Sequence, residues 1–465
     1  MYGKVGRIHM VGIGGSGMSG IAEVLLNMGY EVSGSDMSRT PVTDRLVALG
    51  ARIAGAHTAN LVHGASVVVA STAIRATNPE VVEARRLDIP VIARAEMLAE
   101  LMRMKYGIAV AGAHGKTTTT SIVASVLGDG GLDPTVVVGG RLRAMGSSAR
   151  LGAGRFLVAE ADESDGSFLR LNPAIAVITN IDREHLDHWT GGLPEIEDAF
   201  VTFANKVPFF GLTVACIDDP VTRGIIPRLS RRRVTYGTAP DADYRVADVR
   251  CHDDFSISFD VFEKDFLLGR ARLRVPGRHN ALNALAAVAV ARELDLKAVQ
   301  ILEALDGFDG VSRRFEVKGE EAGVTVVDDY GHHPTEIAAV LRAAKEHSGR
   351  RVVVLFQPHR YTRTRDLLPE FAGCFADADR VFIAPIYEAG EDPIEGVSAD
   401  RIVREVESSG HRGVESVYSL DDLPEVVRPM LQTGDLVITL GAGNIYRTGE
   451  KLLQDLARLG AGARK

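Results

Sequence analysis

The sequence is poor in cysteine and contains no long hydrophobic run. Its three cysteines, Cys216, Cys251 and Cys374, stand far apart in 465 residues and form no C-x-x-C pair. This spacing argues against a disulfide framework and against a thiolate zinc site. No stretch approaches the roughly 18 apolar residues that span a bilayer, and the N-terminal segment lacks the apolar core of a signal peptide. We therefore expect a cytoplasmic protein with no membrane insertion.

An excess of positive charge is also absent. The formal net charge is −8, whereas nucleic-acid-binding proteins usually present a basic face, so we expect no nucleic-acid partner. Hydrophobic residues make up 46% and charged residues 25% of the chain, as in ordinary globular proteins. At roughly 100–200 residues per domain, the length suits two to four domains.

Short apolar runs alternate with amphipathic helical stretches along almost the whole chain. Continuous runs such as YGIAVA, RVVVLF and DLVITL are typical of strands buried on both faces, and therefore of parallel sheets covered by helices. We predict an α/β fold in three segments, residues 1–104, 105–310 and 311–465. Residues 243–275 read as antiparallel strands at one edge of the middle segment.

The first segment opens with a glycine-rich loop between a strand and a helix. Gly12, Gly14 and Gly17 match G-x-G-x-x-G after RIHMV, and the next strand, EVSGS, is followed by Asp36. Such glycines let the backbone approach a pyrophosphate at a helix N-terminus, and the acid meets a ribose. The alternative is a simple turn. The loop does not distinguish NAD, FAD and a UDP-sugar, because all three carry the same diphosphate.

A second glycine loop departs from the common phosphate-loop pattern G-x-x-x-x-G-K-[ST]. The position of the first expected glycine, 110, is Val, and the nearest glycine gives the shorter G-A-H-G-K-T from Gly112 to Thr117. The run YGIAVA precedes it and a helix follows, so backbone N–H groups and Lys116 are placed to hold phosphates. Thr117 is placed to bind Mg²⁺. The alternative is a strand–helix turn with an exposed lysine.

Carboxylates that suit magnesium follow the next strand. Glu160 ends RFLVAE, and Asp162, Glu163 and Asp165 come directly after it. Glu160 is the best ligand candidate because it follows the apolar run, although the acids could also form a solvated turn. His185, after AIAVITNI, is a weaker candidate because histidine is a soft ligand for Mg²⁺.

The last part of the chain carries polar clusters at predicted strand ends. Asn280 and Asn283 share one face of a helix start, where a cap is the commoner role. A strand ends at Asp329, and another leads into an arginine-rich turn typical of anion recognition, although a solvated helix start is equally compatible. The cluster residues are Arg314, Asp329, Tyr330, His332, His333, Arg360 and Arg363.

Eight motifs in this order resemble the Mur ligase family. They are HMVGIGGSGMSG, AGAHGKTTTT, EADESDGSF, ITNIDREHLD, GRHNALNALAA, SRRFE, DDYGHHPTE and FQPHRYTRT. Many members carry Thr at the position of Ala113, a departure that leaves Gly112, Gly115, Lys116 and Thr117 intact. The family's loop is the short form found here.

The resemblance implies three domains: an N-terminal Rossmann-like domain for a UDP-sugar, a central P-loop ATPase-like domain with a parallel sheet, and a C-terminal Rossmann-like domain that closes with the amino acid. It implies ATP-dependent joining of L-alanine to the lactyl carboxylate of UDP-N-acetylmuramate through an acyl phosphate, in peptidoglycan precursor synthesis. The cofactors would be ATP and Mg²⁺, with Mn²⁺ as a substitute, and the protein a monomer or homodimer.

The resemblance also assigns roles to residues, and it reverses the preference for a cap at Asn280. Catalytic roles fall to Lys116, Glu160, His185 and Arg314, and metal ligation to Thr117, Glu160 and His185. ATP binding falls to Gly112, Ala113, His114, Gly115, Lys116, Thr117, Thr118, Asn280, Asn283, Arg314 and Asp329. UDP-sugar binding falls to Gly12, Gly14, Gly15, Ser16, Gly17, Met18, Asp36 and Ser71. Tyr330, His332, His333, Arg360 and Arg363 would face substrate carboxylates or the amino acid.

Three other interpretations remain open at this point. A related ligase, which attaches a ready-made tripeptide to the same UDP-sugar, is a close alternative, although GIGGSGMSG favours the alanine reaction. An NAD-dependent dehydrogenase would explain the first loop and Asp36 but not Lys116, Thr117 and Glu160. A regulatory nucleotide switch would hydrolyse ATP with no acceptor.

Overall fold

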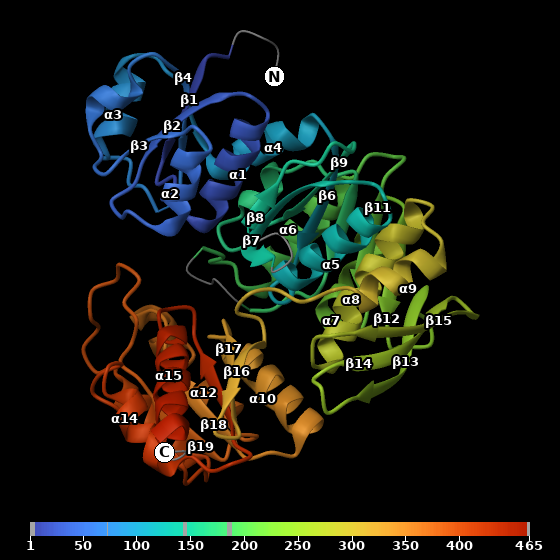
Figure 1. Ribbon diagram of the computed structural model, residues 1–465. Helices are drawn as coiled ribbons and strands as arrows, with labels where there is room; N and C mark the ends of the chain where they lie inside the picture. The colour runs from blue at the N-terminus through green and yellow to red at the C-terminus, as the bar shows by residue number, and fades with distance from the viewer. Residues whose placement is uncertain (1–4, 72, 143–146, 184–187, 463–465) are drawn as a thin grey trace. The chain divides into compact units, whose positions relative to one another are not determined.

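The computed structural model describes residues 5–71, 73–142, 147–183 and 188–462. These residues form three sheets, and Figure 1 follows them in blue, in blue-green to yellow-green, and in orange to red. By their internal contacts they group into two units: residues 1–248, 259–272 and 282–309 form the first, and residues 249–258, 273–281 and 310–465 form the second. The predicted α/β class is confirmed.

The first sheet is parallel throughout, with the strand order β3-β2-β1-β4-β5. Its elements are β1 (Arg7–Val11), α1 (Ser16–Asn27), β2 (Glu31–Ser35), α2 (Pro41–Ala48), β3 (Arg52–Ala54), η1 (Ala59–Val62), β4 (Ala65–Ala70), α3 (Pro79–Arg86), β5 (Val91–Ala93) and α4 (Arg94–Arg103). The carboxyl ends of these parallel strands meet at one edge, which is where ligands bind in open α/β sheets.

Local sequence explains where these helices begin. Thr40 accepts a hydrogen bond from the N–H of Thr43 and precedes Pro41, the first residue of α2. Asn78 caps α3 in the same way ahead of Pro79. Both are a polar cap followed by proline, the combination that favours a helix start.

The middle sheet is mixed rather than purely parallel. Its order is β15-β14-β13-β12-β11-β10-β6-β9-β7-β8, and β7 pairs with β8 antiparallel. The strands are β6 (Tyr106–Ala111), β7 (Thr135–Leu142), β8 (Ser147–Arg150), β9 (Phe156–Glu160), β10 (Ile175–Ile178), β11 (Leu212–Cys216), β12 (Arg233–Gly237), β13 (Tyr244–Cys251), β14 (Ile257–Glu263) and β15 (Phe266–Leu273). β13, β14 and β15 occupy one edge, as the sequence predicted.

The helices of this part include α5, which follows the second glycine loop and is largely buried. They are α5 (Lys116–Asp129), η2 (Ser167–Arg170), α6 (Leu193–Asn205), α7 (Pro220–Ile225), η3 (Ile226–Arg228), α8 (Arg278–Glu293) and α9 (Ala298–Asp306). The run TTTTS is helical and largely buried although threonine disfavours helices. Within it, the Thr119 hydroxyl donates to Asn283 Oδ1 at 3.1 Å and the Ser121 hydroxyl donates to the carbonyl of Thr117 at 2.6 Å.

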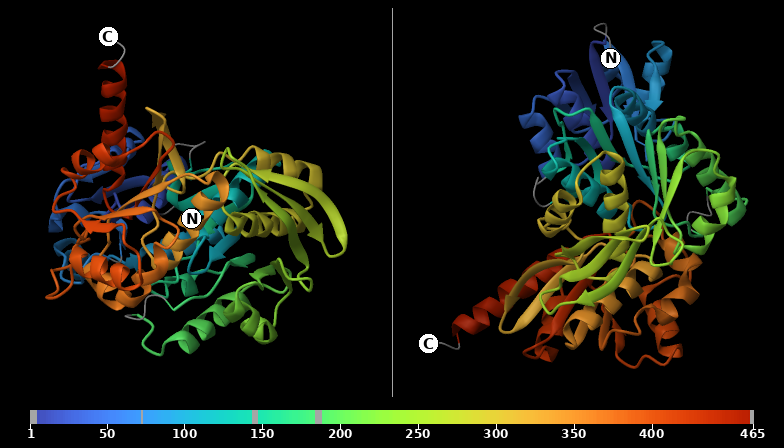
Figure 2. Two further views of the ribbon diagram at one scale, coloured as in Figure 1. Left: turned by 90° about the horizontal axis from the view of Figure 1, so that it is seen from below. Right: turned by 90° about the vertical axis from the view of Figure 1, so that its right-hand side faces the viewer.

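The third sheet has the order β16-β17-β21-β18-β19-β20, with only β16 antiparallel to its neighbour among the described strands. Its elements are β16 (Glu316–Glu321), β17 (Val324–Asp329), α10 (Pro334–Ser348), β18 (Val352–Phe356), α11 (Tyr361–Asp366), α12 (Leu368–Cys374), β19 (Arg380–Ile383), α13 (Ala399–Ser408), β20 (Val414–Ser416), α14 (Leu423–Val427), η4 (Arg428–Met430), β21 (Leu436–Leu440) and α15 (Tyr446–Gly462). The last turns of α15 extend past the strands (Figure 2).

Two separate apolar clusters cover the two faces of this third sheet. Val354, Phe356 and Ile438 belong to one cluster, and their neighbours Leu355 and Val437 belong to the other. Alternate residues of each strand therefore point to opposite cores, which explains the uninterrupted apolar runs in the sequence.

The cysteines are free, and Cys216 and Cys374 are buried. Burial raises the pKa of the Cys216 thiol to about 11. Among the described residues, no helix has the length and apolar character needed to cross a membrane.

The core of the third sheet yields a stability prediction. Phe356 is 0% exposed and packs against Phe371 and Phe375. We expect Phe356→Ala to lower the free energy of unfolding by about 3–5 kcal/mol, from lost burial and the cavity left behind. Urea denaturation followed by circular dichroism measures it. Phe266→Ala, at a side chain that is 77% exposed, serves as the control; equal losses in both variants would contradict the packing described here.

Candidate active site

The second glycine loop joins β6 to α5 with a backbone that requires glycine. Gly112 and Gly115 have φ values of +137° and +80°. A Cβ at Gly112 would lie 2.1 Å from the Thr179 Oγ1, and one at Gly115 would lie 2.8 Å from the Asn283 Oδ1. Both positions therefore exclude larger residues by conformation and by space. Gly115 gives α5 no side-chain cap, so an anion can take that place at the helix N-terminus.

Two residues that follow β10 hold the loop in this shape. The Asn180 carbonyl accepts the N–H of Ala113 at 3.2 Å, and its Oδ1 accepts the N–H of His114 at 2.8 Å. The Thr179 hydroxyl donates to the His114 carbonyl at 2.7 Å. The N–H groups of Ala113 and His114 thus support the loop itself, and the first turn of α5 is left to meet phosphate.

The side chain of Lys116 folds back onto its own loop. Its ammonium group donates to the carbonyls of Gly112 and Ala113 at 2.6 and 2.9 Å and to Glu163 at 2.9 Å. A phosphate that binds Lys116 therefore competes with Glu163 and with these two carbonyls for the ammonium group. The charge of the lysine is neutralised locally in the protein as it stands here.

Glu163 is the buried partner of this ion pair, with 4% of its surface exposed. Burial raises the pKa of Glu163 to about 7, although the Lys116 ammonium opposes the shift. A carboxylate that is this poorly solvated depends on its cation for stability. Lys116 and Glu163 therefore stabilise each other until a stronger anion arrives.

The carboxylate proposed to bind metal lies at the end of β9. Glu160 Oε1 is buried and has no hydrogen-bond partner, an arrangement that costs free energy unless a cation or water completes it. An oxygen donor of this kind and the hydroxyl of Thr117 fit Mg²⁺. The third predicted ligand, His185, lies outside the described residues, and within these the structure holds no cluster of three or more candidate ligands.

The two asparagines of α8 have different surroundings. Asn283 Oδ1 accepts the Thr119 hydroxyl at 3.1 Å and lies beside Gly115, so this residue supports the phosphate loop directly. Asn280 Nδ2 donates to the Pro276 carbonyl at 2.6 Å. This bond closes the turn before α8, whereas a helix cap would accept a backbone N–H.

The N-terminal glycine loop is also pinned by its neighbouring strand. The N–H groups of Gly12 and Ile13 donate to the Ser35 carbonyl at 2.9 and 3.1 Å. Asp36 accepts the N–H of Gly14 at 2.8 Å and that of Ser38 at 3.0 Å. The carboxylate predicted to meet a ribose therefore also braces the glycine loop.

The other residues of this predicted site differ in exposure. The structure describes the backbone of Ser16, which begins α1 after Gly15. The side chain of Met18 is 1% exposed and packs in the core, so only its backbone remains for a ligand. Ser71 follows β4, and its N–H donates to the Val11 carbonyl at 3.3 Å, at the same edge as the glycines.

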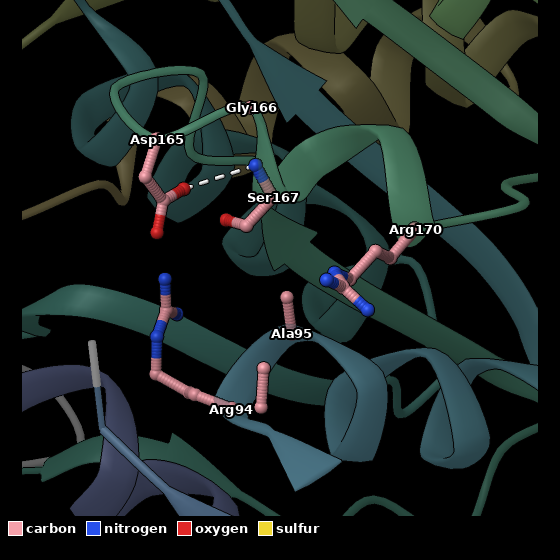
Figure 3. Close-up of a pocket in the computed structure, with 7 residues that line it drawn as sticks. Arg94, Ala95, Asp165, Gly166, Ser167 and Arg170 are labelled. Carbon is pink, nitrogen blue, oxygen red and sulfur yellow. Dashed lines mark hydrogen bonds between the residues drawn. The ribbon is translucent and has the colours of Figure 1, made fainter. Parts of the chain in front are cut away.

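A pocket of about 190 Å³ lies beside this loop and is lined by two arginines that the sequence prediction missed. Arg94 starts α4, and a Cβ at Gly17 would lie 2.8 Å from its guanidinium group. Figure 3 shows Arg94 pointing toward Asp165, and Arg170 directed into the same space. Arg94 lies 3.5 Å from Asp162, and Arg170 pairs with Glu96. Two guanidinium groups favour an anionic or oxygen-rich ligand here.

Asp329 is the last residue of β17, and backbone N–H groups hold its carboxylate in place. Its two oxygens accept the N–H groups of Phe315 and Gly331, each at 2.7 Å. Burial raises the pKa of Asp329 to about 6, against the opposing charge of Arg314. Arg314 lies 5.2 Å from the centre of the Tyr330 ring and 3.9 Å from Glu336.

The two predicted histidines after β17 have different roles. His333 caps α10, since its Nδ1 accepts the N–H of Thr335 at 3.3 Å. His332 Nδ1 lies 3.0 Å from the Tyr330 carbonyl. Burial lowers the pKa of His332 to about 4, with smaller contributions from the nearby arginines. His332 is therefore a neutral hydrogen-bonding group at physiological pH.

The arginine-rich turn after β18 adds a residue that the predictions left out, His359. Arg363 donates to the His359 carbonyl at 3.3 Å, and the His359 ring stacks on Tyr387 with centroids 5.4 Å apart. Burial lowers the pKa of His359 to about 3, helped by His332, Arg363 and Arg360. Arg360 is exposed and has a φ of +72°. The cluster is cationic through its arginines alone.

These features define a class of protein. The short glycine loop between β6 and α5, with its lysine at the start of the helix, is the arrangement of phosphate-loop nucleotide-binding proteins, and the unpaired carboxylate oxygen of Glu160 is of the kind that binds a cation.

Comparison with known proteins identifies the class more closely. Residues 7–106 match the description "Mur ligase family, catalytic domain", residues 110–291 "Mur ligase middle domain", and residues 313–443 "Mur ligase, glutamate ligase domain". The chain belongs to the Mur ligase family.

Similar proteins cover nearly its whole length. The UDP-N-acetylmuramate–L-alanine ligase of Geobacter sulfurreducens is 57% identical over 98% of this chain and 99% of its own. The ligase of the same description from Myxococcus xanthus is 54% identical over 96% of this chain and 94% of its own. The crystal structure of the Thermotoga maritima UDP-N-acetylmuramate-alanine ligase is 30% identical, with a TM-score of 0.83 over 97% of this chain and 98% of its own.

The Lys116–Glu163 pair yields a prediction on nucleotide affinity. We expect Glu163→Gln to bind ATP about three- to tenfold more tightly, which corresponds to about 1 kcal/mol. In the variant, ATP does not compete with a carboxylate for Lys116, and the loop has a more positive net charge. Titration calorimetry measures the dissociation constant. Asp165→Asn, in the same turn but bonded to Ser167, is the control. Weaker binding by Glu163→Gln would mean that the carboxylate aligns Lys116 for the phosphates.

The histidines of the arginine-rich cluster yield a prediction on pH and stability. An unfolded histidine has a pKa near 6.5, whereas that of folded His359 is about 3. Below pH 6.5 the unfolded chain takes up a proton that the folded chain refuses, so this residue lowers stability as pH falls. Asp329, whose folded pKa is about 6, instead adds stability as pH falls, because the folded chain takes up its proton first. This contribution is the same in a His359 variant and in the parent.

We therefore expect His359→Asn to lose less stability than the parent between pH 7 and pH 4.5. Urea midpoints of both proteins at the two pH values measure the difference. His63→Asn, at an exposed histidine paired with Glu83, should follow the parent. A parallel decline of His359→Asn and the parent would disprove the assignment.

Proposed function

We propose that this chain joins L-alanine to the lactyl carboxylate of UDP-N-acetylmuramate with ATP, as a step of peptidoglycan precursor synthesis. The observation that carries the proposal is near-full-length identity of 54–57% to relatives described as UDP-N-acetylmuramate–L-alanine ligases. The glycine loops that follow β1 and β6, each at the carboxyl end of a parallel strand, support the proposal.

The chemistry requires that two anions meet. The lactyl carboxylate attacks the γ-phosphate of ATP, forms an acyl phosphate and releases ADP. Lys116 leaves Glu163 and moves to the phosphates, where its charge offsets their repulsion. Thr117 and Glu160 would hold Mg²⁺, which supplies further charge neutralisation when bound.

The second half of the reaction forms the amide. The ammonium group of L-alanine loses a proton to solvent, and the resulting amine attacks the acyl carbonyl. The tetrahedral adduct loses a second proton from nitrogen to solvent and expels inorganic phosphate, which leaves the amide. The arginines of the C-terminal cluster, Arg314, Arg360 and Arg363, are suited to the carboxylate of alanine and to the departing phosphate, because guanidinium groups bind both.

We assign the three predicted segments accordingly. Residues 1–104 bind the UDP moiety through the glycines after β1, residues 105–310 bind ATP through the loop after β6, and residues 311–465 bring the amino acid. Arg94 and Arg170 extend the first site with a pocket for the sugar portion of the substrate.

A second candidate reaction attaches a tripeptide to the same sugar nucleotide. A Neisseria meningitidis structure described as UDP-N-acetylmuramate:L-alanyl-gamma-D-glutamyl-meso-diaminopimelate ligase is 30% identical over 66% of this chain, with a TM-score of 0.61. The higher identity and coverage of the alanine ligases favour alanine as the acceptor.

Release of phosphate from ATP tests the proposal directly. We expect release that requires both UDP-N-acetylmuramate and L-alanine, and a fall of roughly 10²–10³-fold in kcat for Lys116→Ala, the usual cost of removing one group that stabilises transition-state charge. Lys297→Ala removes an exposed lysine at the start of α9 and should retain the parent rate.

The acceptor that phosphate release requires, L-alanine or the tripeptide, distinguishes the two candidate reactions. Release that depends on the tripeptide and not on L-alanine would establish the second candidate. Hydrolysis that needs no acceptor, or a Lys116→Ala variant that keeps the parent rate, would refute the proposed ligase mechanism.

A further inference from the structure

Two neighbouring phenylalanines lie on the surface just before β11. Phe209 is 81% exposed and Phe210 is 52% exposed, and their rings meet edge to face with centroids 5.3 Å apart. Nothing in the reaction described above uses them. Single exposed apolar side chains are common, but two large rings side by side in water indicate a surface that binds another body.

The two rings lie at the edge of the middle sheet that is opposite the phosphate loop. The Phe210 ring lies 6.4 Å from that of Tyr106, the first residue of β6. Both β6 and β11 pair in parallel with β10, so these residues are at the amino ends of the strands, whereas the phosphate loop follows the carboxyl end of β6. At roughly 3.3 Å per residue, β6 separates the two edges by about 20 Å. The surface is therefore distinct from the candidate active site.

Arginines surround the two rings. Residues 228–233, RLSRRR, contain four arginines and no acid. Arg232 donates to the Phe210 carbonyl at 3.3 Å, and Arg231 donates to the carbonyl of Asn205 at 3.3 Å. These contacts place the basic segment beside the phenylalanines.

A further arginine reaches the same edge through aromatic contacts. Arg155 precedes β9 and lies 5.1 Å from the centre of the Phe156 ring. Phe156 contacts the Tyr106 ring at 5.7 Å, and Tyr106 contacts Phe210. The rings and guanidinium groups thus form one continuous surface at the amino ends of β6, β9, β11 and β12.

Part of this positive charge has no acidic partner. Arg232 pairs with Glu293 at 2.9 Å, and Arg228 pairs with Asp198. The contacts described for three other exposed arginines are to backbone carbonyls or to an aromatic ring, with no carboxylate partner among the described residues; they are Arg155, Arg231 and Arg233. The surface therefore combines apolar rings with positive charge in a chain whose net charge is −8.

This combination matches the surface of an anionic phospholipid bilayer. Aromatic rings enter the region between headgroups and acyl chains, and arginines attract anionic headgroups. A second copy of the chain fits less well. A two-fold interface would place the same patch on both sides, so that the unpaired arginines of the two copies would face one another.

We propose that this edge of the middle sheet is a docking surface for an anionic phospholipid bilayer, formed by Phe209, Phe210, Arg155, Arg231 and Arg233. The contact is peripheral: the two rings enter the headgroup region, and the chain does not cross the bilayer. The inference is independent of the proposed reaction, because it concerns the sheet edge opposite the phosphate loop.

Co-sedimentation with lipid vesicles tests the proposal. We expect the parent to bind vesicles of phosphatidylglycerol and phosphatidylcholine mixed equally, and to bind pure phosphatidylcholine vesicles at least about fivefold less. Salt at about 0.5 M should weaken binding to the mixed vesicles, because it screens the arginines.

Two double variants separate the apolar from the charged contribution. Phe209→Ser with Phe210→Ser, and Arg155→Gln with Arg231→Gln, should each lower the vesicle-bound fraction by about tenfold. The controls are Phe266→Ser, at a phenylalanine that is 77% exposed elsewhere, and Arg342→Gln, at an arginine side chain that is 72% exposed. Both controls should bind as the parent does.

Fluorescence reports directly whether the rings meet lipid. The chain has one tryptophan, Trp189, which is buried, so Phe209→Trp adds a reporter on the surface. We expect its emission to shift to the blue when the mixed vesicles are added. Phe266→Trp is the matched control and should not shift.

Thermal melting and ATP affinity show that each variant is folded, and both should match the parent because the substituted residues lie away from the phosphate loop. Failure of the parent to bind the mixed vesicles, or equal binding by the Phe209→Ser, Phe210→Ser variant, would overturn the inference. Equal binding to pure phosphatidylcholine would overturn it as well. A parent that dimerises in sedimentation equilibrium without binding vesicles, and a double phenylalanine variant that stays monomeric, would assign the surface to a second copy instead.

Discussion

The shape of the phosphate loop depends on the two residues that follow β10. Thr179 and Asn180 bind the backbone of residues 113 and 114 and leave no room for a side chain at Gly112. The segment that follows the neighbouring strand β10 thus supplies hydrogen bonds that fix this short loop. Lys116, Thr117 and the first turn of α5 take their directions from this support.

The charged groups described above are of two kinds: side chains that form an ion pair, and arginines whose charge does not change with pH. Lys116 belongs to the first kind, because its ammonium group pairs with the carboxylate of Glu163. The arginines near β17 and β18 belong to the second kind. Their histidine neighbours, His332 and His359, are neutral at physiological pH, so the positive field there comes from groups that do not titrate.

Most of the fold could be predicted from the sequence because its central strands are buried on both faces. β6, β18 and β21 correspond to uninterrupted apolar runs, and the predicted loops follow them. Strands of three residues such as β3, β5 and β20 escaped prediction, since they are only partly buried and too short to show a period. The antiparallel pairing of β8 likewise has no signature in its few residues.

The candidate site was less predictable wherever side-chain direction decides the role. A motif places Met18 beside a ligand, but its side chain turns into the core. The acidic run after β9 does not reveal that Glu163 faces Lys116 while Glu160 keeps an unpaired oxygen. Arg94 and His359 lie in ordinary helix and turn sequences, and only the fold brings them to a pocket or a cluster. His185 lies outside the described residues, and its role stays a prediction.

The internal ion pair of the phosphate loop has a consequence for selectivity. An empty anion cradle with a free ammonium group would attract chloride, sulfate or inorganic phosphate from solution. Here Glu163 already pairs with that ammonium group at 2.9 Å, so an incoming anion competes with a built-in partner for Lys116. A polyphosphate that also bonds to the N–H groups at the start of α5 gains several contacts at once, so this arrangement favours a nucleotide over a small anion.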